Sequence, residues 1–158
     1  MEPGGYMDEK NFDEWNSLKK KLNSESSITN FREGDVWFCS IGNNVGHEQN
    51  GKNTFFERPV LIVRKFTKNY FWAIPLTSAD RTGPYSFKFE FNGKERVGLL
   101  FHLRFYDRRR LQRKLGSVSQ ETLRKIKQMS GFLLNQKTLF PGSKDGTTSV
   151  TAEVSEAC

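Results

Sequence analysis

Cysteine is scarce in this chain of 158 residues: Cys39 lies in an apolar stretch and Cys158 is the last residue. Two cysteines without a C-x-x-C spacing make no disulfide framework, so we expect a reducing compartment. Long apolar runs are lacking too, since no stretch reaches the roughly 20 residues that span a bilayer. The start, MEPGGYMDEK, has no signal-peptide pattern. These absences favour a soluble, cytoplasmic protein without a membrane partner.

Aromatic side chains supply the apolar mass of an otherwise polar sequence. There are 14 Phe, 4 Tyr and 3 Trp residues, while only 35% of all residues are hydrophobic. We therefore expect an aromatic core and a folded middle of the chain. The length suits one globular domain with extensions.

Positive charge is concentrated in the second half of the chain. The net charge is +7, yet residues 1–30 hold six acids against four bases, and residues 104–127 hold nine bases against Asp107 and Glu121. A polyanion is the natural partner of such a basic block. A solvated basic face that only keeps the protein soluble is the alternative.

The first thirty residues predict a helix and a linker. Residues 11–22 place four large apolar side chains on one helical face, with acids early and lysines late, as the helix dipole favours. The polar stretch 23–30 is typical of a linker. We expect residues 1–30 to be an appendage that packs on the main domain or on a dimer interface. The four apolar side chains are Phe12, Trp15, Leu18 and Leu22.

From residue 31 the pattern changes to short strand-like runs. Aromatic and polar residues alternate at 85–91, which predicts a strand with one buried face. Asn92-Gly93 follows and suits a tight hairpin turn. Five or six short strands without a long helix between them predict a mainly β, small antiparallel barrel. The expected strands cover 35–40, 59–66, 70–76, 85–91, 94–101 and 102–106.

A second helix is expected after the strands, which makes the fold class α+β. The stretch SVSQE at 117–121 is a helix start signal, and the residues after it carry an apolar face that can pack on the barrel. We expect the barrel domain to cover 31–137 with this C-terminal helix included. The tail 138–158 is expected to be disordered, because no aromatic residue or amphipathic pattern follows Pro141.

Three segments could carry chemistry. The connection 41–57 is longer than the usual hairpin loop of roughly 2–5 residues and holds His47 and Glu48. Thr77 and Ser78 follow a buried strand, where hydroxyls can face a groove. The stretch HLRFYDRRRLQRK interleaves aromatic residues with arginines, a mixture that suits single-stranded nucleic acid.

Each segment also has a plain structural interpretation. An isolated loop histidine such as His47 is more often a surface residue, and Glu48 could bond amides of its own loop. Thr77 and Ser78 could cap a strand end. Asp107 could be the ion-pair partner of the arginines around it. Taken one at a time, these structural interpretations are favoured.

Taken together, the segments resemble a known family. GDVWF, GHEQNG, RPVLIV, IPLTS and LRFYDRRRLQRKLGSVSQETLRKIK occur in the order found in the PemK/MazF toxins of type II toxin–antitoxin systems, which include the Kid-like members. The resemblance covers residues 31–134, and GHEQNG followed by RPVLIV is its most specific part. It implies an SH3-like barrel, a homodimer, and an antitoxin partner with an acidic C-terminal segment.

The resemblance also implies a chemistry: metal-independent and cofactor-free cleavage of single-stranded mRNA by attack of the RNA's own 2′-hydroxyl. Such cleavage needs a base, a stabiliser of the charged phosphorane and an acid. By resemblance, Arg58 stabilises the phosphate, Thr77 or Ser78 bonds it, and His47 and Glu48 match loop residues implicated in different members. The expected RNA contacts are Lys52, Arg81, Arg104, Arg108, Arg109, Arg110 and Lys114.

The chain departs from the family pattern in two places. An additional NTFFE lies between Lys52 and Arg58. Kid-like members carry an Arg-x-Asp pair before the basic block, where this chain has Leu99 and Phe101, so the usual base of that subgroup is replaced. His102, one residue further on, or the loop residues His47 and Glu48 could take its place.

The leading hypothesis is therefore a sequence-selective endoribonuclease toxin that leaves a 2′,3′-cyclic phosphate and is neutralised by a cognate antitoxin. A non-catalytic RNA-binding or protein-binding barrel is the main alternative. A DNA-directed poison or regulator is a third.

Overall fold

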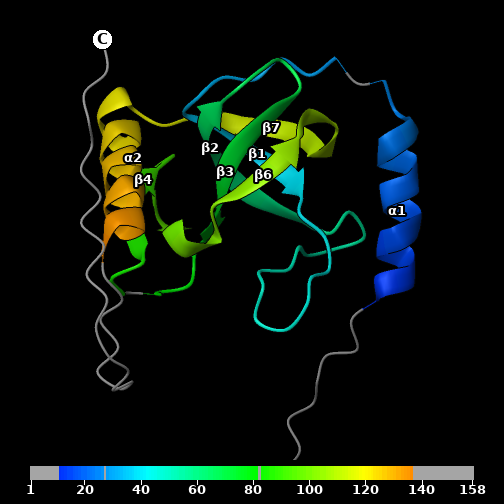
Figure 1. Cartoon of the computed structure of the whole chain (residues 1–158), viewed down its shortest axis with the longest axis horizontal. Coiled ribbons are helices and arrows are strands. Elements are labelled where there is room, and N and C mark those ends of the chain that lie inside the picture. Colours follow the sequence, from blue (N-terminus) through cyan, green and yellow to red (C-terminus); the bar gives the residue numbers. More distant parts are fainter. Residues whose placement is uncertain (1–10, 27, 82, 137–158) are drawn as a thin grey trace, which may run out of the picture.

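Seven strands follow one another along the chain, with one helix before them and one after them (Figure 1). The computed structural model describes residues 11–26, 28–81 and 83–136, so the tail expected to be disordered lies outside the described residues. The elements are α1 (Phe12–Ser24), β1 (Asp35–Ser40), β2 (Glu57–Lys65), β3 (Tyr70–Thr77), β4 (Ser86–Phe91), β5 (Lys94–Leu99), η1 (Leu100–His102), β6 (Arg104–Asp107), η2 (Arg108–Arg110), β7 (Leu111–Ser117) and α2 (Gln120–Asn135).

All strand pairs are antiparallel, and β3 is the strand that bends the sheet. The hydrogen-bonded order is β4-β5-β3-β2-β1-β7, with β6 paired to β3 as well. On one edge of β3, its first residues pair with β6 and its last two with β5. The sheet therefore curls into a barrel that is not fully closed, because no ladder joins β7 to β4 or β6 among the described strands. The predicted mainly β fold with a helix at each end is confirmed.

Two strand predictions need correction. The strand expected at 94–101 ends at Leu99 and the strand expected at 102–106 begins only at Arg104, because residues 100–102 form a turn of 3-10 helix. Sequence reasoning also missed β7, whose residues were assigned to the basic block. Only Leu111 of β7 is fully buried, so its sequence lacks the apolar alternation that marks a strand.

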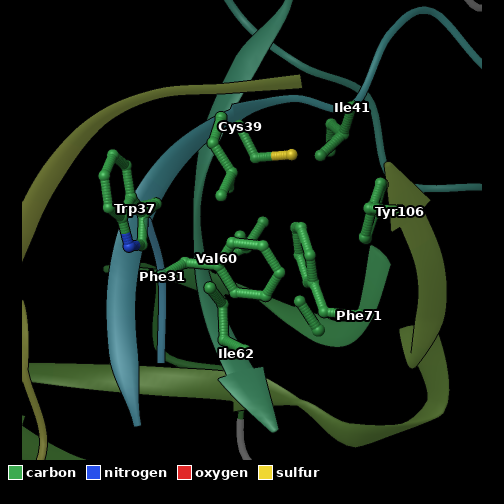
Figure 2. Packing of buried hydrophobic residues seen from close by; sticks show 10 residues of the cluster. Phe31, Trp37, Cys39, Ile41, Val60, Ile62, Phe71 and Tyr106 are labelled. Atoms are coloured by element: carbon green, nitrogen blue, oxygen red, sulfur yellow. The ribbon is translucent and has the colours of Figure 1, made fainter. Parts of the chain in front are cut away.

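Strands β1 and β2 are buried on both faces over most of their length, as the continuous apolar run in β2 predicts, and β3 is buried on both faces from Ala73 to Leu76. Alternate residues point into two separate cores. Val60, Ile62 and Phe71 belong to the core inside the barrel, together with Cys39 and Tyr106 (Figure 2). Any shift of these strands would therefore disturb both cores, so side chains at the strand ends are held in fixed positions.

The second core lies under α2, whose start and apolar face agree with the sequence prediction. Ser119 caps the helix, since its hydroxyl accepts the Thr122 amide at 3.1 Å. Ile126 is fully buried against Val36 and Leu61 from the sheet. Neither helix in the described part of the chain has the length and apolar character needed to cross a membrane.

Helix α1 lies across the barrel from α2 (Figure 1) and has a small core of its own. Trp15 and Leu22 are buried with Phe56, which comes from the connection between β1 and β2. The predicted N-terminal helix is confirmed, and it packs on the barrel end through this connection.

Candidate functional site

The connection between β1 and β2, residues 41–56, is an ordered loop that we call the β1–β2 loop. The Gly51 amide donates to the Gly42 carbonyl at 2.8 Å, and the Gly42 amide donates to the Phe56 carbonyl at 3.1 Å. Lys52 and Glu57 exchange backbone hydrogen bonds of 2.9 and 3.0 Å. A side chain at Gly51 would lie 1.8 Å from the Phe56 carbonyl oxygen, so only glycine fits there. The loop is folded back on itself and held at fixed points.

Arg58 is the second residue of β2, opposite Cys39 of β1, and its guanidinium is held by the β1–β2 loop. Its Nε donates to the Asn50 carbonyl oxygen. With its amide oxygen turned toward the arginine, Gln49 accepts from Arg58 Nη2 at 2.7 Å and from Nε at 2.9 Å. Burial, and then the charge of Arg81, lowers the Arg58 pKa. This cation is therefore both positioned and partly desolvated.

A groove of about 530 Å³ opens beside Arg58 at the end of β3. It is lined by Arg58, Lys52, Thr77 and Ser78, so the structure brings together four of the residues singled out by sequence. The Thr77 hydroxyl accepts the Ala79 amide at 3.1 Å, the strand-end cap foreseen as its structural role, and its own hydrogen stays available for a ligand. Two further cations line the groove, Lys94 and Arg96.

His102 closes η1 within electrostatic reach of the same cluster. Burial lowers its pKa below the ordinary 6.5, and the positive charges of Arg104, Arg81 and Arg58 act in the same direction. Glu48 opposes them. The imidazole is therefore neutral at pH 7 and can accept a proton.

The loop residues His47 and Glu48 do not line this groove. His47 is exposed on a turn of the β1–β2 loop. Glu48 Oε2 accepts the Val45 amide at 3.2 Å, which is the local loop bond foreseen as its structural role. Glu48 also lines a neighbouring cavity of about 520 Å³ next to α1, together with Arg104 and Arg110.

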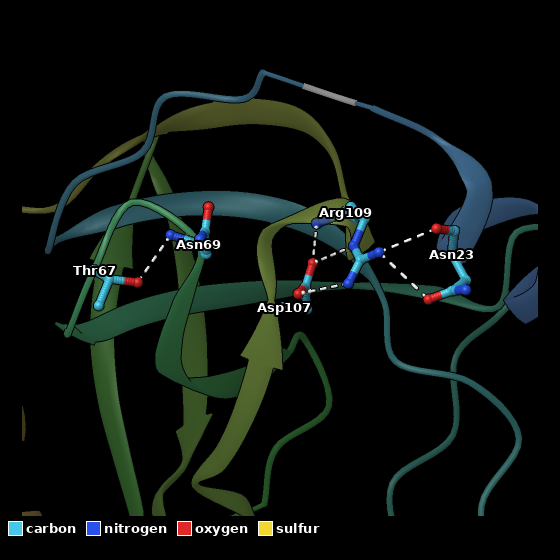
Figure 3. Close-up of polar contacts among 5 residues, drawn as sticks. All are labelled: Asn23, Thr67, Asn69, Asp107 and Arg109. Carbon is cyan, nitrogen blue, oxygen red and sulfur yellow. Dashed lines mark hydrogen bonds and ion pairs between the residues drawn. The ribbon is translucent and has the colours of Figure 1, made fainter.

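Several residues of the basic block are engaged within the fold. Arg109 forks onto Asp107, with Nε to Oδ1 at 2.8 Å and Nη2 to Oδ2 at 3.0 Å, and its Nη1 donates to the Asn23 carbonyl at 3.0 Å (Figure 3). The ion-pair interpretation of Asp107 is confirmed, and Arg109 ties α1 to the barrel. Arg110 donates to the Ser40 carbonyl at 3.0 Å, and Lys114 pairs with a buried aspartate at 2.8 Å. Arg81 remains exposed, Arg104 lies 5.6 Å from the Tyr106 ring, and Arg108 lies on η2.

Glu57 is a chemical group in the groove that sequence reasoning did not single out. Its side chain is 3% exposed, and its Oε1 accepts from Asn53 Nδ2 and from Arg113 Nη1, each at 3.1 Å. Within the described part of the chain, its Oε2 finds no partner. Glu57 belongs to NTFFE, the stretch additional to the family pattern, and its adjacency to Arg58 was the available signal.

The two positions that replace the Arg-x-Asp pair differ in exposure. Leu99 is buried in the sheet, whereas Phe101 is 58% exposed and lies 4.3 Å from the His102 ring. Neither position supplies a titratable group. Across residues 11–26, 28–81 and 83–136, no three His, Cys, Asp or Glu side chains gather as metal ligands would.

The chain combines an antiparallel, barrel-like sheet with a groove that four cations line, Lys52, Arg58, Lys94 and Arg96. Residues 32–129 match the family model described as PemK-like, MazF-like toxin of type II toxin-antitoxin system. Since this match spans more than half of the chain, the chain belongs to that family. No curated protein matches the sequence.

Solved structures with a similar fold agree with this assignment. MazF from Deinococcus radiodurans superposes with a TM-score of 0.53 at 22% identity, over 70% of this chain and 100% of that one. An endoribonuclease in complex with its cognate antitoxin, from a mycobacterial species, has a TM-score of 0.51 at 21% identity and covers 67% and 96%. An endoribonuclease from a mycobacterial species has a TM-score of 0.52 at 19% identity and covers 68% and 93%. At these identities the likeness is one of fold.

Proposed function

We propose that this chain is the toxin of a toxin–antitoxin pair and a sequence-selective endoribonuclease that cuts single-stranded mRNA without a metal or other cofactor. The observation that carries the proposal is Arg58, a half-buried guanidinium fixed by loop oxygens in the lining of a groove that the hydroxyl residues Thr77 and Ser78 also line. A held cation next to hydroxyl groups suits a phosphodiester whose negative charge grows in the transition state.

The reaction begins when the neutral imidazole of His102 takes the proton of a ribose 2′-hydroxyl. The 2′ oxygen attacks the adjacent phosphorus, and Arg58 and the Thr77 or Ser78 hydroxyl stabilise the charged phosphorane. The bond from phosphorus to the 5′ oxygen then breaks, and this oxygen takes a proton, for which His47 of the β1–β2 loop is the candidate acid. The Glu48 carboxylate, which accepts the Val45 amide, is a candidate base only. The products are a 2′,3′-cyclic phosphate and a free 5′-hydroxyl. DNA lacks the 2′-hydroxyl and is not cut.

The cations around the groove bind the RNA backbone on either side of the cut. Lys52, Lys94 and Arg96 line the groove, and Arg81 and Arg104 lie near His102. We assign the phosphate contacts to these side chains in preference to Arg109 and Lys114, which the fold already engages. Specificity then comes from bases held in the groove.

The partners follow from the same surface. An antitoxin with an acidic C-terminal segment complements a cationic groove and can block it. The mycobacterial endoribonuclease solved with its cognate antitoxin is a precedent within the fold. We also propose that the chain works as a homodimer in the cytoplasm.

The first prediction concerns Arg58. Because Arg58 stabilises charge that exists only in the transition state, Arg58→Ala should lower kcat by about 10²–10³-fold while the fold is retained. The measurement is cleavage of single-stranded RNA in the presence of a chelator, with analysis of the product ends. Arg124→Ala, an exposed arginine of α2, is the matched control and should cleave normally.

Undiminished cleavage by Arg58→Ala would refute the mechanism. So would products that carry a 5′-phosphate, because attack by the 2′-hydroxyl leaves that phosphate on the other fragment.

A second candidate function is a non-catalytic RNA-binding barrel. The buried Leu99 and the exposed Phe101, in place of an Arg-x-Asp pair, favour it. Salt-sensitive RNA binding without cleavage in the assay above would select this function.

A further inference from the structure

Trp15 of α1 is seated on both ends of the β1–β2 loop. Its indole is 6% exposed, and a Cβ built on Gly42 would lie 2.4 Å from its Cε2 and Cζ2 atoms. Its ring centroid lies 5.6 Å from that of Phe56, at an interplanar angle of 56°. Gly42 is the second residue of the loop and Phe56 is its last, so a single side chain contacts both ends.

Hydrogen bonds within the loop connect the Trp15 contact to Arg58. The Gly51 amide donates to the Gly42 carbonyl at 2.8 Å, next to Asn50, whose carbonyl accepts from Arg58. Asn44 braces the same turn, since its Nδ2 donates to the Gln49 carbonyl at 2.7 Å and its backbone amide donates to Asn50 Oδ1 at 2.7 Å. Each step from Trp15 to the guanidinium is therefore a direct contact.

Two arginines of the basic block also fix helix α1 to the barrel. The Arg110 guanidinium lies 5.3 Å from the Trp15 ring centroid, a cation–π contact. Arg109 joins Asn23 at the end of the helix to Asp107 of β6 (Figure 3). The helix is thus anchored by the basic block at two points.

The small core of α1 is separate from both barrel cores. Trp15 and Leu22 pack with Phe56, while the clusters inside the barrel and under α2 contain no residue of α1. The barrel therefore does not need α1 to fill its interior. What α1 covers is the loop that holds Arg58.

We propose that Trp15 is a positioning residue: it holds the β1–β2 loop so that Asn50 and Gln49 keep the Arg58 guanidinium in place. The proposal rests on the role of Arg58 given under Proposed function. Misplacing a catalytic group by about 1 Å can cost on the order of 100-fold in rate, so a loop held at both ends matters for kcat.

The second prediction follows. Trp15→Ala should lower kcat for RNA cleavage by roughly 10–100-fold and change KM less, because backbone phosphate contacts elsewhere are kept. Trp15→Phe, which keeps a ring on Gly42, should restore most of the rate. Phe12→Ala removes an aromatic side chain that is 48% exposed on the same helix and should leave the rate unchanged.

A double-mutant cycle separates positioning from general damage. If Trp15 acts through Arg58, Trp15→Ala should cost almost nothing more in a chain that already carries Arg58→Ala. Two losses that simply multiply would overturn the proposal. If Trp15→Ala fails to fold, Trp15→Leu keeps the apolar burial and enters the same cycle.

Amide hydrogen exchange tests whether Trp15 holds the β1–β2 loop, and it needs no RNA. The Gly42 and Gly51 amides should exchange faster in Trp15→Ala than in the wild type, while amides of β2 and β3 keep their protection. Unchanged protection in the loop would overturn the proposal. Absence of cleavage by the wild type, combined with faster loop exchange in the variant, would reject the proposed function but support the role of Trp15 in holding the loop.

Discussion

Arg58 and Glu57 are neighbours in sequence, but their side chains point to different partners. The strand alternation sends the Arg58 guanidinium to the loop oxygens, whereas the Glu57 carboxylate is buried and neutralised by Arg113 at 3.1 Å. An unpaired carboxylate at that depth would be costly, so Arg113 allows an acid to sit beside the cation that we propose as the phosphate stabiliser. The charge of the groove therefore stays positive.

The third prediction concerns the pH dependence of His102. Its lowered pKa keeps the imidazole neutral to a more acidic pH than an ordinary histidine. If it is the base, kcat/KM is full above this pKa and falls as pH drops through it, with the midpoint below 6.5.

The measurement is the pH profile of kcat/KM for wild type and His102→Gln between pH 5 and pH 8, the range in which histidine titrates. His102→Gln should lower the rate at neutral pH by about 10²–10⁴-fold and lose the acidic limb. An identical profile in the variant would assign the base elsewhere, with Glu48 or His47 next in line.

At the scale of the element, the helices were easier to predict than the last strand. Both helices show an apolar face, a cap and a charge bias within their own sequence. β7 shows none of these signals, because it is an edge strand whose partner β1 decides its position. Asp35 Oδ1 of β1 accepts the Ser117 hydroxyl at 2.7 Å and pairs with Lys114 Nζ at 2.8 Å, both from β7. These contacts join residues that lie far apart in the sequence.

The fourth prediction concerns α2. Ile126 is fully buried between the helix and the sheet, so Ile126→Ala should lower the free energy of unfolding by about 2–5 kcal/mol. Denaturant unfolding measures it. Phe132→Ala on the same helix removes a side chain that is 61% exposed and should cost less than about 0.5 kcal/mol. Equal costs for the two variants would contradict the packing of α2 on the sheet.

At the scale of the whole molecule, the cations divide into two groups. Arg109, Arg110 and Lys114 of the basic block bond to α1 and β1, whereas the cations of the groove come from the β1–β2 loop, from β2 and from β5. The charge excess of the chain therefore overstates the surface that we propose for RNA binding. Ion pairs that a fold needs are not free to release counterions on binding.

The fifth prediction uses this division. Binding of 2′-O-methyl RNA, which cannot be cut, should weaken with salt, with a slope that falls by about 0.7 for each phosphate contact removed. Lys94→Ala in the groove should reduce the slope by that amount, while Arg124→Ala on α2 should leave it unchanged. A slope that responds equally to both variants would mean that binding follows net charge alone.

The sequence by itself determined the fold class, the two helices and the order of the first strands, and it pointed to Arg58 as a candidate site residue. These depend on local periodicity, caps and a motif, all of which are present within short windows. It also pointed to Thr77 and Ser78 at a strand end, and to His102 as a substitute base.

Only the tertiary structure decided which of these groups meet. It placed Lys52, Arg58, Thr77 and Ser78 around one groove, left Glu48 in a neighbouring cavity, added Glu57, and set Trp15 against Gly42. Such juxtapositions arise from strand pairing and from packing between segments far apart in the chain. The stretch GHEQNGKNTFFERPVLIV contains Arg58 and the loop residues that hold it. The fold packs α1, which lies outside this stretch, against Phe56 of the loop.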